Sequence, residues 1–186
     1  MRIISGKLKG KSINFLKNST TRPLKDSVKE NIFNILSHSR SINTNIEKSN
    51  ILDLYSGVGS FGLECISRGA KKVTFIEEDE NALKILRKNV INFSITHQVE
   101  IINNKIENIL SKKTGQKYNI FFFDPPFLDK TFIQNLELIK KNKIYEDKHI
   151  VIIHREKKTH DILDKFIDSI IIKNYGRSKI IFGIFN

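Results

Sequence analysis

Apolar segments of strand length recur along the second part of the chain and alternate with segments of helical spacing. The strand-like segments are ILDLY from Ile51, VTFIE from Val73, VEIIN from Val99, YNIFFFD from Tyr118 and HIVIIH from His149. The segments 60–68, 79–91 and 106–110 carry apolar residues at helical spacing, and Asp79 is expected to cap the second of them. Near-continuous apolar runs are typical of strands buried on both faces, as in a parallel sheet covered by helices.

Two further strands are predicted at the end of the chain, at 167–173 and 179–185. The turn sequence YGRS between them is too short for the crossover that parallel strands require, so the two should pair antiparallel. The pattern therefore predicts one α/β domain over residues 1–186. Its core is a doubly wound, mostly parallel, seven-stranded sheet of Rossmann-like type with an antiparallel last strand.

The first 40 residues follow a different pattern and are predicted to form a basic arm and a helix. Residues 2–15 alternate weakly, and Gly6 and Gly10 bracket a basic turn, which indicates a small hairpin. A helix should begin near Asp26 or Ser27, because Ser27 and Glu30 have the S-x-x-E spacing of a capping box. Its apolar face would carry Val28, Ile32, Ile35 and Leu36. A polar, turn-rich stretch then separates residues 1–40 from a core at 50–186.

Basic residues are concentrated in this arm. The chain has a formal net charge of +12, and its first 29 residues contain eight Lys or Arg and one acidic residue, Asp26. Such a bias indicates a polyanionic partner, with solubility as the alternative explanation. The candidate nucleic-acid contacts are Arg2, Lys7, Lys9, Lys11, Arg22 and Lys25.

Other compositional features narrow the class of protein. The single cysteine, Cys65, excludes an intramolecular disulfide and disfavours a zinc site, so no metal is expected. Apolar runs stay far below the length of roughly 18 residues that a membrane span requires, and the basic N-terminus lacks a secretory apolar segment. These features indicate a cytoplasmic protein, and a monomer is expected.

A glycine-rich turn follows the first predicted core strand. Gly57, Gly59 and Gly62 have G-x-G-x-x-G spacing, and Glu77 stands 20 residues after Gly57 at the end of the next strand. This arrangement is typical of a nucleoside cofactor whose ribose hydroxyls bind the acid. A nicotinamide dinucleotide and S-adenosylmethionine both fit. Asp53, interpreted as part of the turn region, favours the second, because a carboxylate would hold the α-ammonium group and repel a pyrophosphate.

The fourth core strand ends in Asp124-Pro125-Pro126-Phe127. One interpretation is a rigid turn that ends the strand. The chemical interpretation is that Asp124 and the Pro125 carbonyl accept the two hydrogens of an exocyclic base amine, which directs the nitrogen lone pair at a sulfonium methyl group. Phe127 would stack on the base, and no metal is needed.

These motifs resemble a known family. DLYSGVGSFGLE, IEED and DPPF resemble the class I S-adenosylmethionine-dependent methyltransferases that modify exocyclic amines. RIISGKLKGKSI, TRPLKDSVKENIFNIL, SRGAKKVTFIEED and YGRSKIIF resemble the 16S ribosomal RNA guanine-N2 methyltransferase family. The resemblance implies methylation of guanine 966 in 16S rRNA or in a small-subunit assembly intermediate, with residues 124–127 catalytic. It implies a cofactor site formed by Asp53, Tyr55, Ser56, Gly57, Gly59, Glu77, Glu78, Asn104 and Asp124.

Two residues depart from the family pattern. Asn104 stands where an Asp usually bonds the adenine amino group, and it could still accept through its amide oxygen. His154 stands where the family tends to carry an acid, and it is expected at a strand end or facing RNA, away from the amine chemistry. Three alternatives stay open: an adenine-N6 or other amino-methyltransferase on DNA or RNA, a NAD-dependent oxidoreductase, and a nucleic-acid-binding protein without catalysis.

Overall fold

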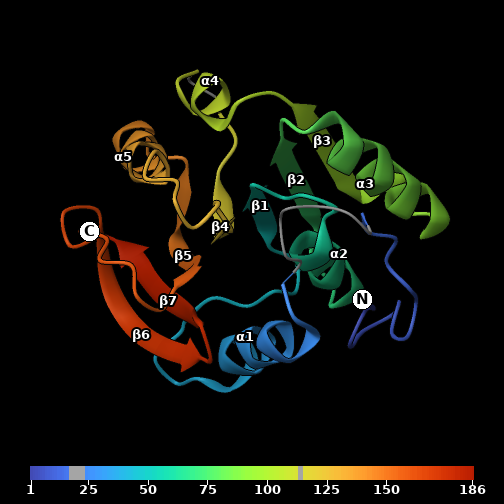
Figure 1. Ribbon diagram of the computed structural model, residues 1–186, viewed down its shortest axis with the longest axis horizontal. Coiled ribbons are helices and arrows are strands. Elements are labelled where there is room, and N and C mark those ends of the chain that lie inside the picture. The colour runs from blue at the N-terminus through green and yellow to red at the C-terminus, as the bar shows by residue number, and fades with distance from the viewer. Residues whose placement is uncertain (17–23, 113–114) are drawn as a thin grey trace.

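A seven-stranded sheet forms the centre of the protein in this computed structural model, which describes residues 1–16, 24–112 and 115–186 (Figure 1). The strands lie in the order β3-β2-β1-β4-β5-β7-β6. They are β1 (Asn50–Leu54), β2 (Lys72–Glu77), β3 (Val99–Asn103), β4 (Tyr118–Phe123), β5 (Tyr145–Glu156), β6 (Ile167–Tyr175) and β7 (Ser178–Phe185).

The predicted fold class is confirmed. The neighbouring strand pairs from β3 through β5 are parallel, whereas β7 runs antiparallel to both β5 and β6. A two-residue turn joins β6 to β7, as the short YGRS segment requires. The last strand of the chain, β7, lies between β5 and β6 and is the antiparallel strand of the sheet.

Helices cover both faces of the sheet. Helices α1 (Asp26–His38), α2 (Ser60–Ser67) and α3 (Glu80–Asn92) contribute to one buried apolar cluster, and α4 (Ile106–Leu110) and α5 (Phe132–Asn142) to another. A short 3-10 helix, Thr96–Gln98, precedes β3. Helix α5 was not among the helices predicted from the sequence. None of the helices in the described ranges is long and apolar enough to cross a membrane.

The two predicted helix caps have different outcomes. Asp79 caps α3 as expected, since its Oδ1 accepts from the Ala82 N–H at 2.7 Å. The capping box at Ser27 is wrong: the N-cap of α1 is Lys25, and no side chain caps this end. Because the helix begins at Asp26, Ser27 already lies within the first turn, where its hydroxyl cannot play the capping role.

The N-terminal arm forms the predicted hairpin in a short version. Arg2 and Ser12 form one antiparallel bridge, and the Ile3 N–H donates to the Lys11 carbonyl at 3.0 Å. Gly6 has a positive φ, and a Cβ there would lie 1.9 Å from the Ser67 carbonyl oxygen, so the arm can pack against α2 only with glycine at this position.

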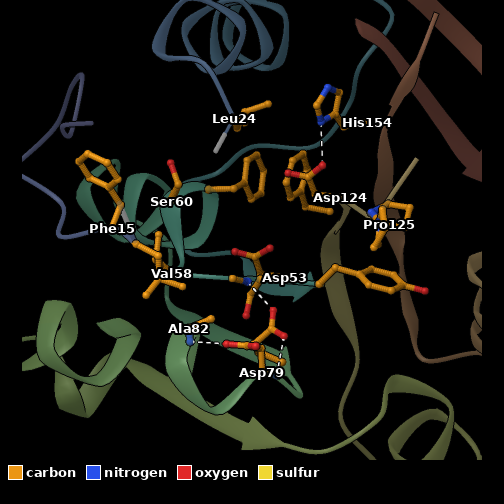
Figure 2. Close-up of a pocket in the computed structure, with 18 of the residues that line it drawn as sticks. Phe15, Leu24, Asp53, Val58, Ser60, Asp79, Ala82, Asp124, Pro125 and His154 are labelled. Carbon is orange, nitrogen blue, oxygen red and sulfur yellow. Dashed lines mark hydrogen bonds and ion pairs between the residues drawn. The ribbon is translucent and has the colours of Figure 1, made fainter. Parts of the chain in front are cut away.

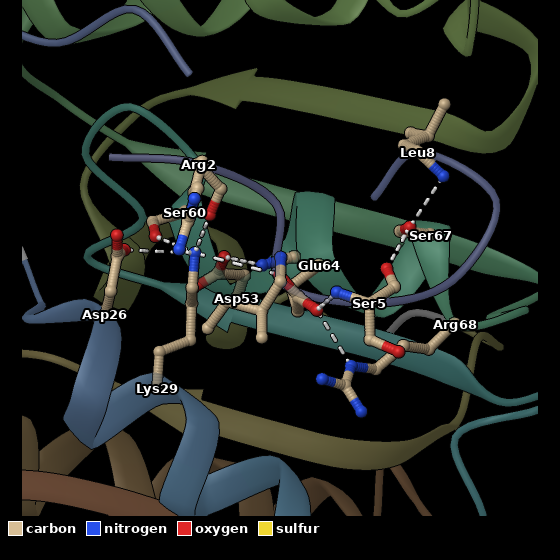
Figure 3. Close-up of polar contacts among 12 residues, drawn as sticks. Arg2, Ser5, Leu8, Asp26, Lys29, Asp53, Ser60, Glu64, Ser67 and Arg68 are labelled. Atoms are coloured by element: carbon tan, nitrogen blue, oxygen red, sulfur yellow. Dashed lines mark hydrogen bonds and ion pairs between the residues drawn. The ribbon is translucent and has the colours of Figure 1, made fainter. Parts of the chain in front are cut away.

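A buried carboxylate holds this arm on the core (Figure 3). Glu64 of α2 is fully buried and accepts from the N–H groups of Ile4, at 2.7 Å, and Ser5, at 2.9 Å. The buried Lys29 of α1 lies 3.7 Å from Glu64 and donates to the Arg2 carbonyl at 2.8 Å. Burial lowers the Lys29 pKa, which its acidic neighbours oppose. Arm, α1 and α2 therefore share one polar anchor.

Candidate active site

The glycine turn connects β1 to α2. Three of its residues, Tyr55, Gly57 and Gly59, have positive φ angles of 58°, 54° and 84°. A Cβ on Gly59 would lie 2.4 Å from Leu86 Cδ1, so this glycine permits close packing of the turn on α3. A Cβ added to Gly57 would meet no atom of the described residues within 4 Å. Gly57 also lines a cavity.

Glu77, at the end of β2, holds the turn in place. Its Oε2 accepts from the Gly57 N–H at 2.7 Å, and its Oε1 accepts from the N–H groups of Glu78 and Asp79 at 2.9 Å each. An ionised carboxylate offers about four acceptor positions. Three are used by the backbone, which leaves about one for a ligand hydroxyl. Glu77 thus shapes the loop in addition to its predicted role toward a ribose.

A cavity of about 1080 Å³ opens where β1, β2, β4 and β5 end (Figure 2). This is the edge at which doubly wound sheets bind their ligands. Its lining includes these predicted site residues: Asp53, Tyr55, Ser56, Gly57, Glu77, Glu78, Asp124, Pro125, Pro126 and Phe127. The lining also includes residues that were not predicted as site residues, among them Met1, Phe15 and Leu24 from the arm, His154, and Arg177.

Asp53 lies within β1 and not in the turn region, which corrects its predicted placement. Asp53 is 1% exposed, and its Oδ2 accepts from the Gly62 N–H at 2.9 Å. Burial raises the Asp53 pKa well above its usual range; the Gly62 bond opposes this, and the charges of Asp124 and Glu77 add to it. A cationic ligand in the cavity would favour the ionised form of this group.

The turn after β4 is held by a buried guanidinium group. Arg155 is 1% exposed and donates to the carbonyls of Pro126 and Phe127, at 3.1 and 3.0 Å. It also pairs with Asp161, with an Nε to Oδ2 distance of 3.0 Å, and lies over the Phe132 ring. Arg155 therefore fixes the two carbonyls that follow Pro125. The Asp-Pro-Pro-Phe sequence by itself does not indicate that Arg155 holds this turn.

His154 contacts the predicted catalytic acid, so the expectation that it lies away from the amine chemistry is wrong. Its Nδ1 is 2.7 Å from Asp124 Oδ1 (Figure 2). Its Nε2 is 2.9 Å from Ser178 Oγ. The side chain is buried rather than surface-facing. The cause is strand register: Phe123 of β4 pairs with Ile153 of β5, which places the two following residues side by side.

Asn104 is not among the residues that line the cavity. Its Oδ1 accepts from the Lys105 N–H at 2.8 Å and from Asn108 Nδ2 at 2.9 Å, at the start of α4. The amide oxygen expected to bind an adenine amino group is therefore already used locally. Gly59 also does not line the cavity and acts through packing.

The candidate RNA-contacting side chains lie on the exposed surface of the arm. Those described are Arg2, Lys7, Lys9, Lys11 and Lys25, and Arg22 lies outside the described residues. Lys7 Nζ donates to Gln98 Oε1 at 2.8 Å, and Lys11 Nζ lies 5.6 Å from the centre of the Phe93 ring. Contact with RNA stays a prediction for all of them.

Comparison with known proteins identifies the family. The chain matches the family described as Conserved hypothetical protein 95 over residues 1–184. A Buchnera aphidicola subsp. Baizongia pistaciae protein named Ribosomal RNA small subunit methyltransferase D is 32% identical over 185 residues, covering 100% of this chain and 91% of the relative. A Haemophilus influenzae protein of the same name is 33% identical, with 84% and 79% covered.

Solved structures support the same relationship. The structure of yhhF from Escherichia coli has a TM-score of 0.84 at 26% identity and covers 98% of this chain and 96% of that one. The fold is that of the class I methyltransferases, as the motifs predicted. The chain belongs to the Conserved hypothetical protein 95 family, the family of the Ribosomal RNA small subunit methyltransferase D proteins.

Proposed function

We propose that this protein transfers a methyl group from S-adenosylmethionine to the exocyclic N2 amine of a guanine in 16S rRNA. The observation that carries the proposal is the placement of Asp124 and the Pro125 segment on the same cavity as Asp53 and the glycine turn. The names of the relatives supply the substrate class, small-subunit ribosomal RNA. The choice of guanine N2 depends on the family resemblance of the arm and of α1. The enzyme would act in the cytoplasm as a monomer.

The lining of the cavity fits S-adenosylmethionine better than a dinucleotide. Among the described residues, five acidic side chains and one basic side chain, Arg177, border it; the acidic ones are Asp53, Glu77, Glu78, Asp79 and Asp124. Such a lining attracts the positive α-ammonium and sulfonium groups and opposes a pyrophosphate. Asp53 and Glu77 would hold the cofactor, and Phe61, Val58 and Ala82 supply apolar surface. This charge balance disfavours the oxidoreductase alternative.

The chain's own groups would prepare the base amine for attack. An exocyclic amine is a poor nucleophile because its lone pair is delocalised into the ring. When bound, S-adenosylmethionine supplies an electrophilic methyl group. Asp124 and the Pro125 carbonyl would accept hydrogen bonds from the two N–H groups of the amine. These hydrogen bonds would orient the nitrogen lone pair and stabilise the positive charge that develops on nitrogen. Phe127 would stack on the base.

The basic arm would bind the RNA backbone. Its exposed cations stand on a segment that also lines the cavity through Met1 and Phe15. Phosphate contacts from this arm would therefore place a nucleotide next to Asp124. Naked rRNA and a partly assembled subunit are both compatible with this surface.

The identity of the modified nucleoside tests the proposal. The protein is incubated with labelled S-adenosylmethionine and with unmodified 16S rRNA, assembled small subunits or duplex DNA. The product is then digested to nucleosides and separated. We expect label in N2-methylguanosine from the ribosomal RNA arms. Label in 6-methyladenine from DNA, or tight binding of NAD without binding of S-adenosylmethionine, would contradict the assignment.

Cofactor binding should weaken in acid because Asp53 loses its charge. Burial raises the Asp53 pKa, so this carboxylate becomes protonated at a higher pH than an ordinary aspartate. Calorimetry should show the Kd for S-adenosylmethionine rising as pH falls. Asp53→Asn should weaken binding by about 10- to 100-fold at pH 8 and flatten the pH dependence. The control is Asp147→Asn, an exposed acid on β5. An Asp53→Asn protein with wild-type affinity would contradict the cofactor role.

Removal of arm cations should weaken RNA binding without affecting the cofactor. The triple variant carries Lys7→Gln, Lys9→Gln and Lys11→Gln. The negative slope of log affinity against log salt concentration should become shallower by roughly one for each lysine that binds a phosphate in the wild-type protein. The Kd for S-adenosylmethionine should stay unchanged. Lys117→Gln, an exposed lysine beside the first residue of β4, is the control. An unchanged affinity and slope for the triple variant would rule out the arm as an RNA contact.

A further inference from the structure

We propose that His154 is a positioning residue that sets the orientation of Asp124 for methyl transfer. This inference depends on the proposed function, in which Asp124 accepts a hydrogen of the base amine. It concerns a residue that the sequence placed at a strand end or facing RNA, away from the amine chemistry. The two side chains come from adjacent parallel strands, β4 and β5, and meet at the edge of the cavity.

The hydrogen bonds define which atoms carry protons. A carboxylate oxygen only accepts, so His154 Nδ1 is the donor in the 2.7 Å contact with Asp124 Oδ1. In the neutral ring, Nε2 then accepts from the Ser178 hydroxyl at 2.9 Å. The carboxylate of Asp124 therefore sets the tautomer, and the contact with Ser178 helps to hold the plane of the ring. With Oδ1 engaged, the second oxygen of Asp124 is the one available to the substrate amine.

Burial and packing make this arrangement rigid. His154 is 7% exposed, and its ring lies edge-on to Phe127, with centroids 5.6 Å apart. The ring thus contacts both the acid and the aromatic residue proposed to hold the base. The next residue, Arg155, fixes the carbonyls after Pro125. Two successive residues near the end of β5, His154 and Arg155, therefore contact the turn at residues 124, 126 and 127.

The cavity around Asp124 is lined by charged side chains. Asp53, Glu77, Glu78 and Asp79 are the other acidic residues on the same lining. The hydrogen bond from His154 holds one carboxylate oxygen of Asp124 in place and leaves the other to accept from the amine. Arg177, in the turn before β7, is a further charged residue on the same lining.

Two substitutions separate this role from packing. Asn at position 154 presents an amide N–H near the position of Nδ1, whereas Leu fills similar space without a donor. We expect His154→Leu to lower kcat by roughly 10²-fold, as misplacement of a reacting group does. His154→Asn should keep kcat within about threefold of wild type, because the donor is retained. Both should bind S-adenosylmethionine as wild type does.

The matched control is His149→Asn. His149 is a second buried histidine of β5, whose Nε2 accepts from the Phe185 N–H at 2.9 Å, and it does not line the cavity. This variant should unfold more easily with an unchanged kcat. The substrates are unmodified 16S rRNA and small subunits, with calorimetry of S-adenosylmethionine run on each protein.

The outcomes distinguish this inference from the proposed function. A wild-type protein that methylates rRNA, with a His154→Leu variant equally active, would overturn the role of His154 and leave the function intact. Loss of cofactor binding in His154→Leu, or failure of His154→Asn to restore kcat, would assign the residue to packing instead. A wild-type protein that binds no S-adenosylmethionine and methylates no RNA would overturn the function itself.

Discussion

A buried arginine is the constraint on which the proposed chemistry depends. Arg155 is removed from water, and its charge is balanced by Asp161 and by two backbone carbonyls. A guanidinium group buried in this way is stable only when its donors are paired, so the contacts fix one conformation of the turn. Arg155 bonds the carbonyls of Pro126 and Phe127, not that of Pro125. Asp124 and Pro125, which line the cavity, directly precede the two residues that Arg155 holds.

The sequence was most informative where local rules decide the structure. Apolar periodicity located the strands, the short YGRS turn implied antiparallel pairing, and Asp79 could be recognised as a helix cap. Each of these depends on residues close together in the chain. The glycine spacing also located the cavity, because a turn with positive φ angles and an acid after the next strand form a local unit.

The sequence did not predict the features that depend on contacts between segments far apart in the chain. The contact between Asp124 and His154 depends on the register of two parallel strands, which no local pattern specifies. The capping box expected at Ser27 did not form, because α1 begins at Asp26 with Lys25 as its N-cap. The role that the family pattern assigns to Asn104 stays a prediction, and its amide oxygen accepts two local hydrogen bonds at the start of α4. Residues from the arm line the cavity, and contacts with distant residues, among them Glu64 and Asn89, hold the arm on the core.

The central claim is that Asp124 accepts from the base amine, and substitution of that residue tests it most directly. Asp124→Ala should bind S-adenosylmethionine with a Kd within about tenfold of wild type, but its single-turnover rate of methyl transfer to 16S rRNA or small subunits should fall by at least roughly 10²-fold. Asp129→Ala, an acid on the same segment that does not line the cavity, is the matched control. An Asp124→Ala protein that methylates at the wild-type rate would contradict the account.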